Sequence, residues 1–416
     1  MVKGKHFLAA LVPVLFLSGC SSIPEWVNPT TWFDDEEEQD VQQLKPIDEL
    51  FQPDIKWDSG VGDGVKHYFS RLSPANAYGK VFAANRQGLV KAVDENTGDK
   101  VWEIDLAEYH NEGYLSAVTN LWADGISAKI SGGLVASYET LYFGTENGLV
   151  LALDEATGEI KWQQKVKGEV LATPVVDGGF VVVNTGSGIL YGLDAETGEE
   201  KWIYESEVPP LTLRGISAPA LSAGAAIVGT ANGKLSAVVL ESGQVAWEQV
   251  IASASGTTEL ERLVDIDSQA LVLGGVVYTI SYNGTLAAVE LRTGRVIWKR
   301  EYRSYRRISL DGNTLFVVDD SSQVYGLDRR TGVELWAQTT LRGRDLTAAT
   351  PMDSYVVVGD KFGFLHWLRQ SDGQLVARIE VGGDDEEEGI YVAPVRNGKV
   401  LYTQTRDGDL VAISIP

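Results

Sequence analysis

The side chains that most often perform catalysis or bind metals are few and scattered in this chain. Cys20 is its one cysteine, so an intramolecular disulfide and a cysteine-based zinc or iron–sulfur site are both excluded. The histidines form no H-E-x-x-H pair, and they stand at His6, His67, His110 and His366. The sequence therefore predicts neither a catalytic residue nor a metal site.

Cys20 fits a different chemistry, which is lipid attachment. An apolar stretch over residues 7–17 follows Lys3 and Lys5, and it is shorter than the roughly 20 residues that span a bilayer. Such a stretch is typical of a signal peptide. It ends in the letters L-S-G-C, which resemble the lipobox of bacterial lipoproteins. An ordinary signal peptide with a chance cysteine is the alternative.

The lipobox resemblance implies that residues 1–19 are removed and that the mature chain begins at a lipidated Cys20. Ser21 stands where an aspartate retains lipoproteins at the inner membrane, so the resemblance implies anchoring to the outer membrane, facing the periplasm. Residues 20–52 contain several prolines and an acidic run at residues 34–40. This composition is typical of a solvated tether, and docking of the run to a basic partner is the alternative.

The charge balance narrows the class of partner. The chain has 35 Lys+Arg against 58 Asp+Glu, which gives a formal net charge of −23. Binding of nucleic acid depends on clustered lysine and arginine, so this composition argues against a nucleic acid partner. The hydrophobic content of 44% is sufficient for a large core.

A repeated phrase organises the rest of the chain. It runs from a glycine through a short apolar segment and an Asp-x-x-Thr-Gly turn to a tryptophan, as from Gly148 to Trp162. The apolar segment predicts a buried strand, the turn residues predict a hairpin, and a second strand carries the tryptophan. Two further strands lie upstream in each unit. Four antiparallel strands repeated about every 45 residues predict an all-β, eight-bladed β-propeller over residues 53–416.

The spacing also predicts how the ring closes. The eighth repeat opens at Gly408, and the chain ends at Pro416 before the outer strand of that blade. Trp57 lies one period before Trp102, so the N-terminal strand around it is expected to complete the last blade and remove the exposed sheet edges. The repeat tryptophans are expected to pack between blades as structural residues. They are Trp57, Trp102, Trp162, Trp202, Trp247, Trp298 and Trp336.

The phrase A-[LV]-D-x-x-[TS]-G-x-x-x-W resembles the repeats of pyrroloquinoline quinone (PQQ) dehydrogenases. The lipobox, the chain length and two loops resemble the BamB family more closely, the lipoproteins of the outer-membrane β-barrel assembly (Bam) machinery. The first resemblance implies an enzyme with a quinone and calcium on the propeller axis. Asp319, Asp320 and Asp360 lie at turns of the sixth and seventh repeats, where ordinary turn acids are the simpler interpretation. The second implies a non-enzymatic scaffold without a cofactor, which is the function predicted here.

The two loops are the inter-blade connections at residues 205–215 and 251–267. They belong to consecutive junctions, so they are expected to be neighbours on one face, and their apolar, arginine and acidic residues suit an interface. The BamB resemblance implies docking onto the POTRA domains of BamA, through Leu211, Leu213, Arg214, Asp265 and Asp267. The alternative is that the leucines roof the propeller and the acids cap turns. Other Bam subunits and unfolded outer-membrane protein precursors are further partners that the resemblance implies.

Two other segments are expected on the same face. Residues 108–133 lengthen one inter-blade interval, and residues 384–388 form a second acidic run. The sequence predicts no role for either segment.

Overall fold

The computed structural model describes residues 41–107, 126–213, 216–255, 257–258, 261–383 and 388–416. Cys20 and Arg214 lie outside the described residues, as do the acidic run at 34–40 and most of the run at 384–388. Within the described residues, the secondary structure elements are all β-strands.

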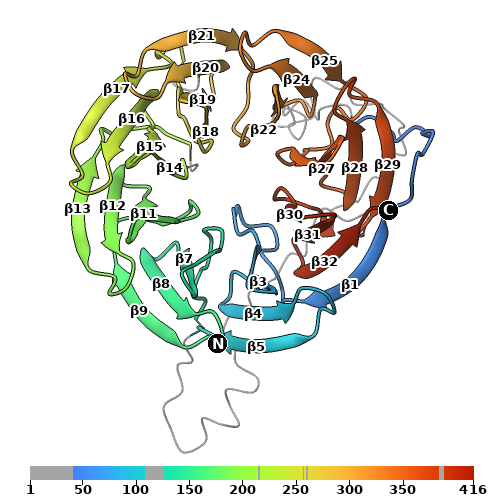
Figure 1. Cartoon of the computed structure of the whole chain (residues 1–416), viewed down its shortest axis with the longest axis horizontal. Helices are drawn as coiled ribbons and strands as arrows, with labels where there is room; N and C mark the ends of the chain where they lie inside the picture. Colours follow the sequence, from blue (N-terminus) through green and yellow to red (C-terminus); the bar gives the residue numbers. More distant parts are fainter. Residues whose placement is uncertain (1–40, 108–125, 214–215, 256, 259–260, 384–387) are drawn as a thin grey trace, which may run out of the picture. The chain divides into compact units, whose positions relative to one another are not determined.

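Eight four-stranded antiparallel sheets follow one another around a ring and form the blades (Figure 1). Blades 1 to 4 contain, from the inner to the outer strand, β2 (Ala75–Ala77), β3 (Lys80–Ala84), β4 (Leu89–Asp94) and β5 (Lys100–Asp105); β6 (Val135–Ser137), β7 (Thr140–Gly144), β8 (Leu149–Asp154) and β9 (Ile160–Lys165); β10 (Val175–Asp177), β11 (Phe180–Asn184), β12 (Ile189–Asp194) and β13 (Glu200–Glu205); and β14 (Ala220–Ser222), β15 (Ala225–Gly229), β16 (Lys234–Val239) and β17 (Val245–Val250).

Blades 5 to 8 contain, in the same order, β18 (Leu271–Leu273), β19 (Val276–Ile280), β20 (Thr285–Glu290) and β21 (Val296–Glu301); β22 (Ser309–Asp311), β23 (Thr314–Val318), β24 (Val324–Asp328) and β25 (Glu334–Gln338); β26 (Thr350–Met352), β27 (Tyr355–Gly359), β28 (Phe364–Arg369) and β29 (Leu375–Glu380); and β30 (Val395–Asn397), β31 (Val400–Gln404), β32 (Asp409–Ser414) and β1 (Asp54–Gly60). The predicted eight-bladed propeller is confirmed.

The last blade combines the two ends of the described chain. Strand β1 pairs antiparallel with β32, and Trp57 lies opposite Ala412 in the register. Figure 1 shows β1 at the outer edge of this blade, beside β32. The predicted closure of the ring by an N-terminal strand is therefore confirmed.

Burial differs between the middle and outer strands of a blade. All five residues of β7 are buried, and four of the six in β8 are buried, because each blade packs between two neighbours. This explains the continuous apolar runs in the sequence. In the outer strand β9 only Trp162 is buried, so that strand has no continuous apolar run.

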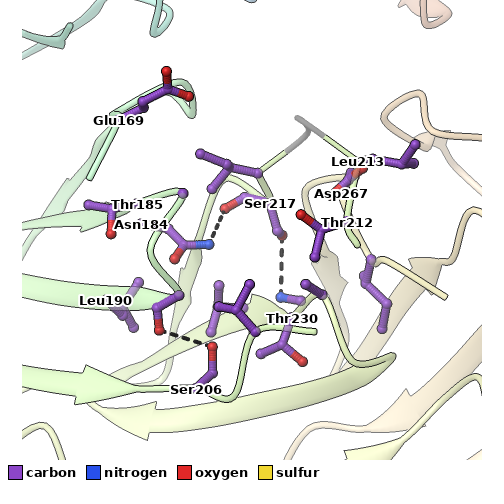
Figure 2. A pocket seen from close by; sticks show the side chains of 18 of the residues that line it. Glu169, Asn184, Thr185, Leu190, Ser206, Thr212, Leu213, Ser217, Thr230 and Asp267 are labelled. Carbon is purple, nitrogen blue, oxygen red and sulfur yellow. Dashed lines mark hydrogen bonds between the residues drawn. The ribbon is translucent and has the colours of Figure 1, made fainter. Parts of the chain in front are cut away.

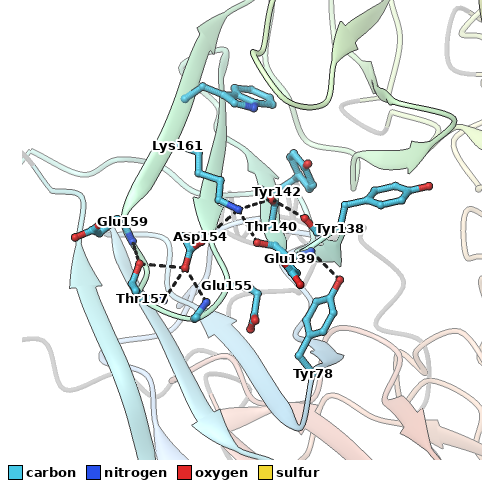
Figure 3. A network of polar contacts seen from close by, with 12 residues as sticks. Tyr78, Tyr138, Glu139, Thr140, Tyr142, Asp154, Glu155, Thr157, Glu159 and Lys161 are labelled. Carbon is cyan, nitrogen blue, oxygen red and sulfur yellow. Dashed lines mark hydrogen bonds and ion pairs between the residues drawn. The ribbon is translucent and has the colours of Figure 1, made fainter.

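The turn between the two outer strands is built by its own side chains. In blade 2, the Asp154 carboxylate oxygen Oδ1 accepts hydrogen bonds from the backbone N–H groups of Ala156 and Thr157, both at 3.0 Å. Lys161 lies 3.3 Å from the other carboxylate oxygen, as Figure 3 shows. Gly158 closes the turn with a φ of +78°, in the left-handed region that favours glycine.

Each repeat tryptophan packs on the turn of the next blade. The Trp102 indole Nε1 donates a hydrogen bond to the Glu155 carbonyl at 2.9 Å. Its ring lies against Gly158, where an added Cβ would be 2.7 Å from the ring atom Cε3. The same contact joins the other pairs, which are Trp57/Gly98, Trp162/Gly198, Trp202/Gly243, Trp247/Gly294, Trp298/Gly332 and Trp336/Gly373. The tryptophan therefore excludes a side chain at the glycine, which explains why both residues recur in the repeat.

The seventh blade lacks this tryptophan for a topological reason. Ala377 occupies its position in β29 and is fully buried. The next blade receives its outer strand from the N-terminus, so no Asp-x-x-Thr-Gly turn connects β32 to β1 and there is no glycine for a tryptophan to pack on. Phe51 and Ile415 belong to the hydrophobic cluster around Ala377 instead.

The segment before β1 contacts the propeller, which differs from the solvated tether expected up to residue 52. Leu44 and Ile47 pack against a core cluster of blades 6 and 7. The Phe51 ring lies 5.0 Å from the Tyr355 ring and 6.3 Å from the Trp367 ring, between centroids. The apolar residues among the prolines and acids of this segment therefore have a packing role.

The tryptophan–glycine contact makes a testable prediction. Gly158→Ala should lower the free energy of unfolding by about 2–5 kcal/mol, because it adds left-handed strain of about 1–2 kcal/mol and overpacking against Trp102 of about 1–3 kcal/mol. Gly79→Ala is the matched control, since Gly79 has a φ of +70° but an added Cβ there meets nothing within 4 Å. Urea denaturation measures both variants. Equal losses would contradict the packing role of Trp102.

Candidate partner-binding face

The two predicted loops contact each other on one face of the propeller. One connects β13 to β14 and the other connects β17 to β18, so they belong to consecutive blade junctions. The backbone N–H of Leu213 donates a hydrogen bond to the Asp265 carboxylate oxygen Oδ1 at 3.1 Å. Figure 2 shows Thr212 and Leu213 of the first loop beside Asp267 of the second. Four of the five predicted binding residues are therefore brought together, and Arg214 lies outside the described residues.

The four residues differ in how they meet solvent. Leu211 is 47% exposed and Leu213 is half-buried, whereas Asp265 and Asp267 are buried. A cavity of about 380 Å³ lies between the loops, lined by residues of both, including Pro210, Leu211 and Leu263. A partner can therefore reach the two leucines in this conformation, whereas the two aspartates lie below them.

The Asp265 side chain supports the first loop. Its Oδ1 accepts the Leu213 hydrogen bond, and its backbone carbonyl accepts one from the Tyr282 N–H at 2.9 Å. Burial raises the pKa of the Asp265 carboxyl to about 6, although the Leu213 hydrogen bond acts in the opposite direction. This carboxylate accepts a hydrogen bond from the backbone of Leu213 and so controls the shape of the leucine segment. The carboxylate itself does not face a partner.

Arg71 ties the ends of both loops to a third connection, the one that precedes β2. Its guanidinium Nη1 donates hydrogen bonds to the Ile216 carbonyl at 2.7 Å and to the Asp267 carbonyl at 2.9 Å. Burial raises the pKa of the Asp267 carboxyl to about 7, against the opposing charge of Arg71. Sequence reasoning missed Arg71, because it lies 196 positions from Asp267 and belongs to no repeat motif.

A second cavity, of about 370 Å³, lies beside the first loop, between blades 3 and 4 (Figure 2). Thr212, Leu213 and Asp267 line it, with small polar side chains of the neighbouring turns. Asn184 and Ser217 are hydrogen bonded across it, from Nδ2 to the Ser217 carbonyl at 2.9 Å. The cavity continues the surface formed by the two loops.

Two of the acids that were considered as calcium ligands, Asp319 and Asp360, form hydrogen bonds or ion pairs with other residues of the protein. Asp360 bonds Arg344 at 2.6 Å and His366 at 2.8 Å. Asp319 accepts hydrogen bonds from the Gln323 N–H at 2.7 Å and the Tyr325 hydroxyl at 3.1 Å. Among the residues that the structure describes, no group of three or more His, Cys, Asp or Glu side chains is placed to hold a metal ion. The same part of the chain contains no helix long and apolar enough to cross a membrane.

The closed ring of four-stranded blades, the glycine-to-tryptophan repeat and the pair of contacting loops define a propeller of the PQQ-like repeat class. A family model described as Outer membrane protein assembly factor BamB matches residues 86–338. The Alteromonas naphthalenivorans protein of that name is 53% identical over 405 residues, covering 97% of this chain and 95% of the relative. The chain therefore belongs to the BamB family of outer membrane protein assembly factors.

Comparison with solved structures distinguishes between the two families that the sequence resembles, BamB and the PQQ dehydrogenases. The crystal structure of BamB from Moraxella catarrhalis superposes with a TM-score of 0.74 at 26% identity, covering 87% of this chain and 99% of that one. Quinohemoprotein alcohol dehydrogenase from Comamonas testosteroni reaches a TM-score of 0.67 at 14% identity, covering 89% of this chain and 78% of the enzyme, so its likeness concerns the fold alone. The prediction of a non-enzymatic assembly factor of the Bam complex is confirmed by family membership.

The two buried aspartates make a pH prediction. Both carboxyls bind their proton more tightly in the folded than in the unfolded chain, so they lower the free energy of unfolding as the pH rises from about 4 to about 7. Asp267→Asn should therefore reduce the stability lost between pH 5 and pH 8 by roughly 2–4 kcal/mol. Asp48→Asn removes an exposed carboxylate and is the control. Identical pH profiles of Asp267→Asn and the unaltered protein, measured by urea denaturation, would refute the argument.

Proposed function

We propose that this Bam complex subunit binds the POTRA domains of BamA through the face formed by its two contacting loops. Leu211 and Leu213 are the apolar anchors, and Arg214 makes a charge-assisted contact with the partner. Asp265 and Asp267 hold the loops in shape from below. The single observation that carries the proposal is the Leu213–Asp265 hydrogen bond, because it makes one surface of two segments that are far apart in the sequence.

The proposed mechanism is presentation by a rigid body. A closed propeller changes shape little on binding, so a partner docked on the loop face loses mobility without any chemical step. The protein thereby holds the periplasmic domains of BamA or increases the local capture of unfolded barrel precursors. No described contact favours precursor binding over the first role, and BamA is the partner proposed here.

A pull-down from detergent-solubilised envelope tests the proposal. The tagged full-length protein is expected to retain BamA. Limited proteolysis of the washed complex should then map the contact to the POTRA domains of BamA. Recovery of other Bam subunits without BamA would contradict direct binding to BamA.

The proposed location is the periplasmic side of the outer membrane, with residues 1–19 as signal peptide and residues 20–52 linking Cys20 to the propeller. Cys20→Ala should abolish metabolic labelling with a fatty acid and release the protein from the outer-membrane fraction, because acyl chains contribute about 0.8 kcal/mol per buried CH₂. Cys20→Ser gives the same test with a smaller change of side chain. Unchanged labelling and fractionation would refute lipid attachment at Cys20.

A further inference from the structure

The ends of the inter-blade connections surround a cavity of about 300 Å³ on the propeller axis. Most of its lining comes from the segments that lead into the innermost strands of seven blades, all except the second, and Lys361 and Arg406 come from the turns that follow β27 and β31. This volume lies at the small end of the range of about 300–1,000 Å³ for ligand pockets. The cavity shares no lining residue with the two cavities beside the binding loops, although Arg71 of its lining bonds the carbonyls of Ile216 and Asp267, which line one of them.

The charge of this cavity is opposite to that of the protein. Its cationic lining residues are Arg71, Arg306, Arg307, Lys361 and Arg406. Asp345 is the one acid among the described lining residues, and it is ion paired with Arg306. A chain with a formal net charge of −23 therefore concentrates cations at its axis. Such a concentration attracts small anions into the cavity, while the surrounding negative charge disfavours large polyanions.

Two of the arginines around the cavity, Arg71 and Arg406, are held in place by backbone carbonyls that do not neutralise them. Arg71 donates to two backbone carbonyls, as described above, and Arg406 donates to the carbonyls of Lys66 at 2.9 Å and Tyr68 at 3.4 Å. A carbonyl orients a guanidinium but carries no net charge. Asp267 is the acid that acts on Arg71, and burial keeps that carboxyl partly protonated near pH 7.

Arg307 is the residue best placed to receive a ligand. In the part of the chain that the structure describes, its guanidinium has no hydrogen bond and no ion pair. Arg307 is exposed and lines the cavity, so a ligand there can reach its guanidinium. The planar fork of N–H groups on a guanidinium matches the oxygens of a phosphate or carboxylate, so Arg307 can bind such a group in two places at once.

We infer that the axial cavity is a binding site for a small oxyanion with two or more negative charges, held by Arg307 with Arg71 and Arg406 alongside. Phosphate and carboxylate groups share this chemistry. The site shares Arg71 with the supports of the proposed BamA-binding loops, but Arg307 does not belong to those supports, so variants of Arg307 test this inference separately.

Isothermal titration of the full-length protein in detergent, at constant ionic strength, tests the inference with inorganic phosphate, pyrophosphate and citrate as probes. We expect saturable binding of one equivalent of at least one probe. Arg307→Gln should weaken it roughly tenfold or more, the equivalent of one charge-assisted hydrogen-bonding group. Preference for pyrophosphate would assign a phosphoryl ligand, and preference for citrate a polycarboxylate.

Arg303→Gln is the matched control, because it removes the same charge from an exposed position in the same connection that does not line the cavity. It should change the affinity by less than about twofold. Arg307→Lys retains the charge without the planar fork, so its affinity should lie between those of Arg303→Gln and Arg307→Gln. This variant also tests the inference if Arg307→Gln does not fold. Absence of saturable binding for all three probes, or equal losses in Arg303→Gln and Arg307→Gln, would overturn the inference.

Discussion

A chain that begins at Val61, without strand β1, is expected to unfold at a much lower temperature than a chain that begins at Val41. Loss of β1 exposes the edge of β32 and removes Trp57, which is buried and donates a hydrogen bond to the Glu95 carbonyl at 3.0 Å. Truncation of a buried tryptophan to alanine alone costs about 3–5 kcal/mol. Thermal unfolding followed by circular dichroism measures the difference.

A third truncation separates closure of the ring from the packing of the preceding segment. A chain that begins at Pro53 keeps β1 but loses the contacts of Leu44, Ile47 and Phe51, so its melting temperature should be intermediate. Two point variants on one strand complete the comparison. Trp57→Ala should reproduce most of the loss, and Ile55→Ala, which truncates a side chain that is 42% exposed, should reproduce little of it. Equal melting temperatures for the chains beginning at Pro53 and Val61 would refute the role of β1 in closure.

The fold was predictable because the repeat records contacts that every blade makes. The glycine of the turn and the tryptophan that packs on it recur in the sequence at a fixed spacing, and the position of Trp57 one period early indicated the closing strand. The contacts of residues 42–51 were not predictable in this way. They cover blades 6 and 7 near the place where blade 8 lacks a turn, and nothing in the sequence repeats there.

The candidate site was predictable in its loops and less so in the roles of its side chains. Composition and the order of the blades placed Leu213 and Asp265 on adjoining loops, and the structure brings them together. Burial of Asp265 and Asp267 depends on how the second loop packs between blades 4 and 5, which the spacing of the acids does not record. Arg71 reaches the site from a connection three blades before the first loop and four blades before the second, so only the closed ring places it there.

The second prediction with a large expected effect concerns the proposed interface with BamA. Leu211→Ala and Arg214→Ala are each expected to weaken binding to the BamA POTRA domains by about 2 kcal/mol or more, which is roughly 30-fold in Kd, if these residues are the centre of the contact. Leu211 is 47% exposed, so its truncation should leave the melting temperature of the free protein nearly unchanged. Surface plasmon resonance with the purified POTRA domains measures the affinity.

Controls on the opposite face decide whether the loop face is the binding face. Leu273→Ala truncates a leucine that is 40% exposed beside the turn that connects β18 to β19, which lies on the side of the Asp-x-x-Thr-Gly turns. Glu196→Ala removes an exposed acid from one of those turns, whereas Glu155 is unsuitable because it is ion paired with Lys80 at 2.6 Å. Both controls should bind normally, because neither side chain lies near the loops. Loss of binding in these variants, together with normal binding of Leu211→Ala, would move the interface to the opposite face of the propeller.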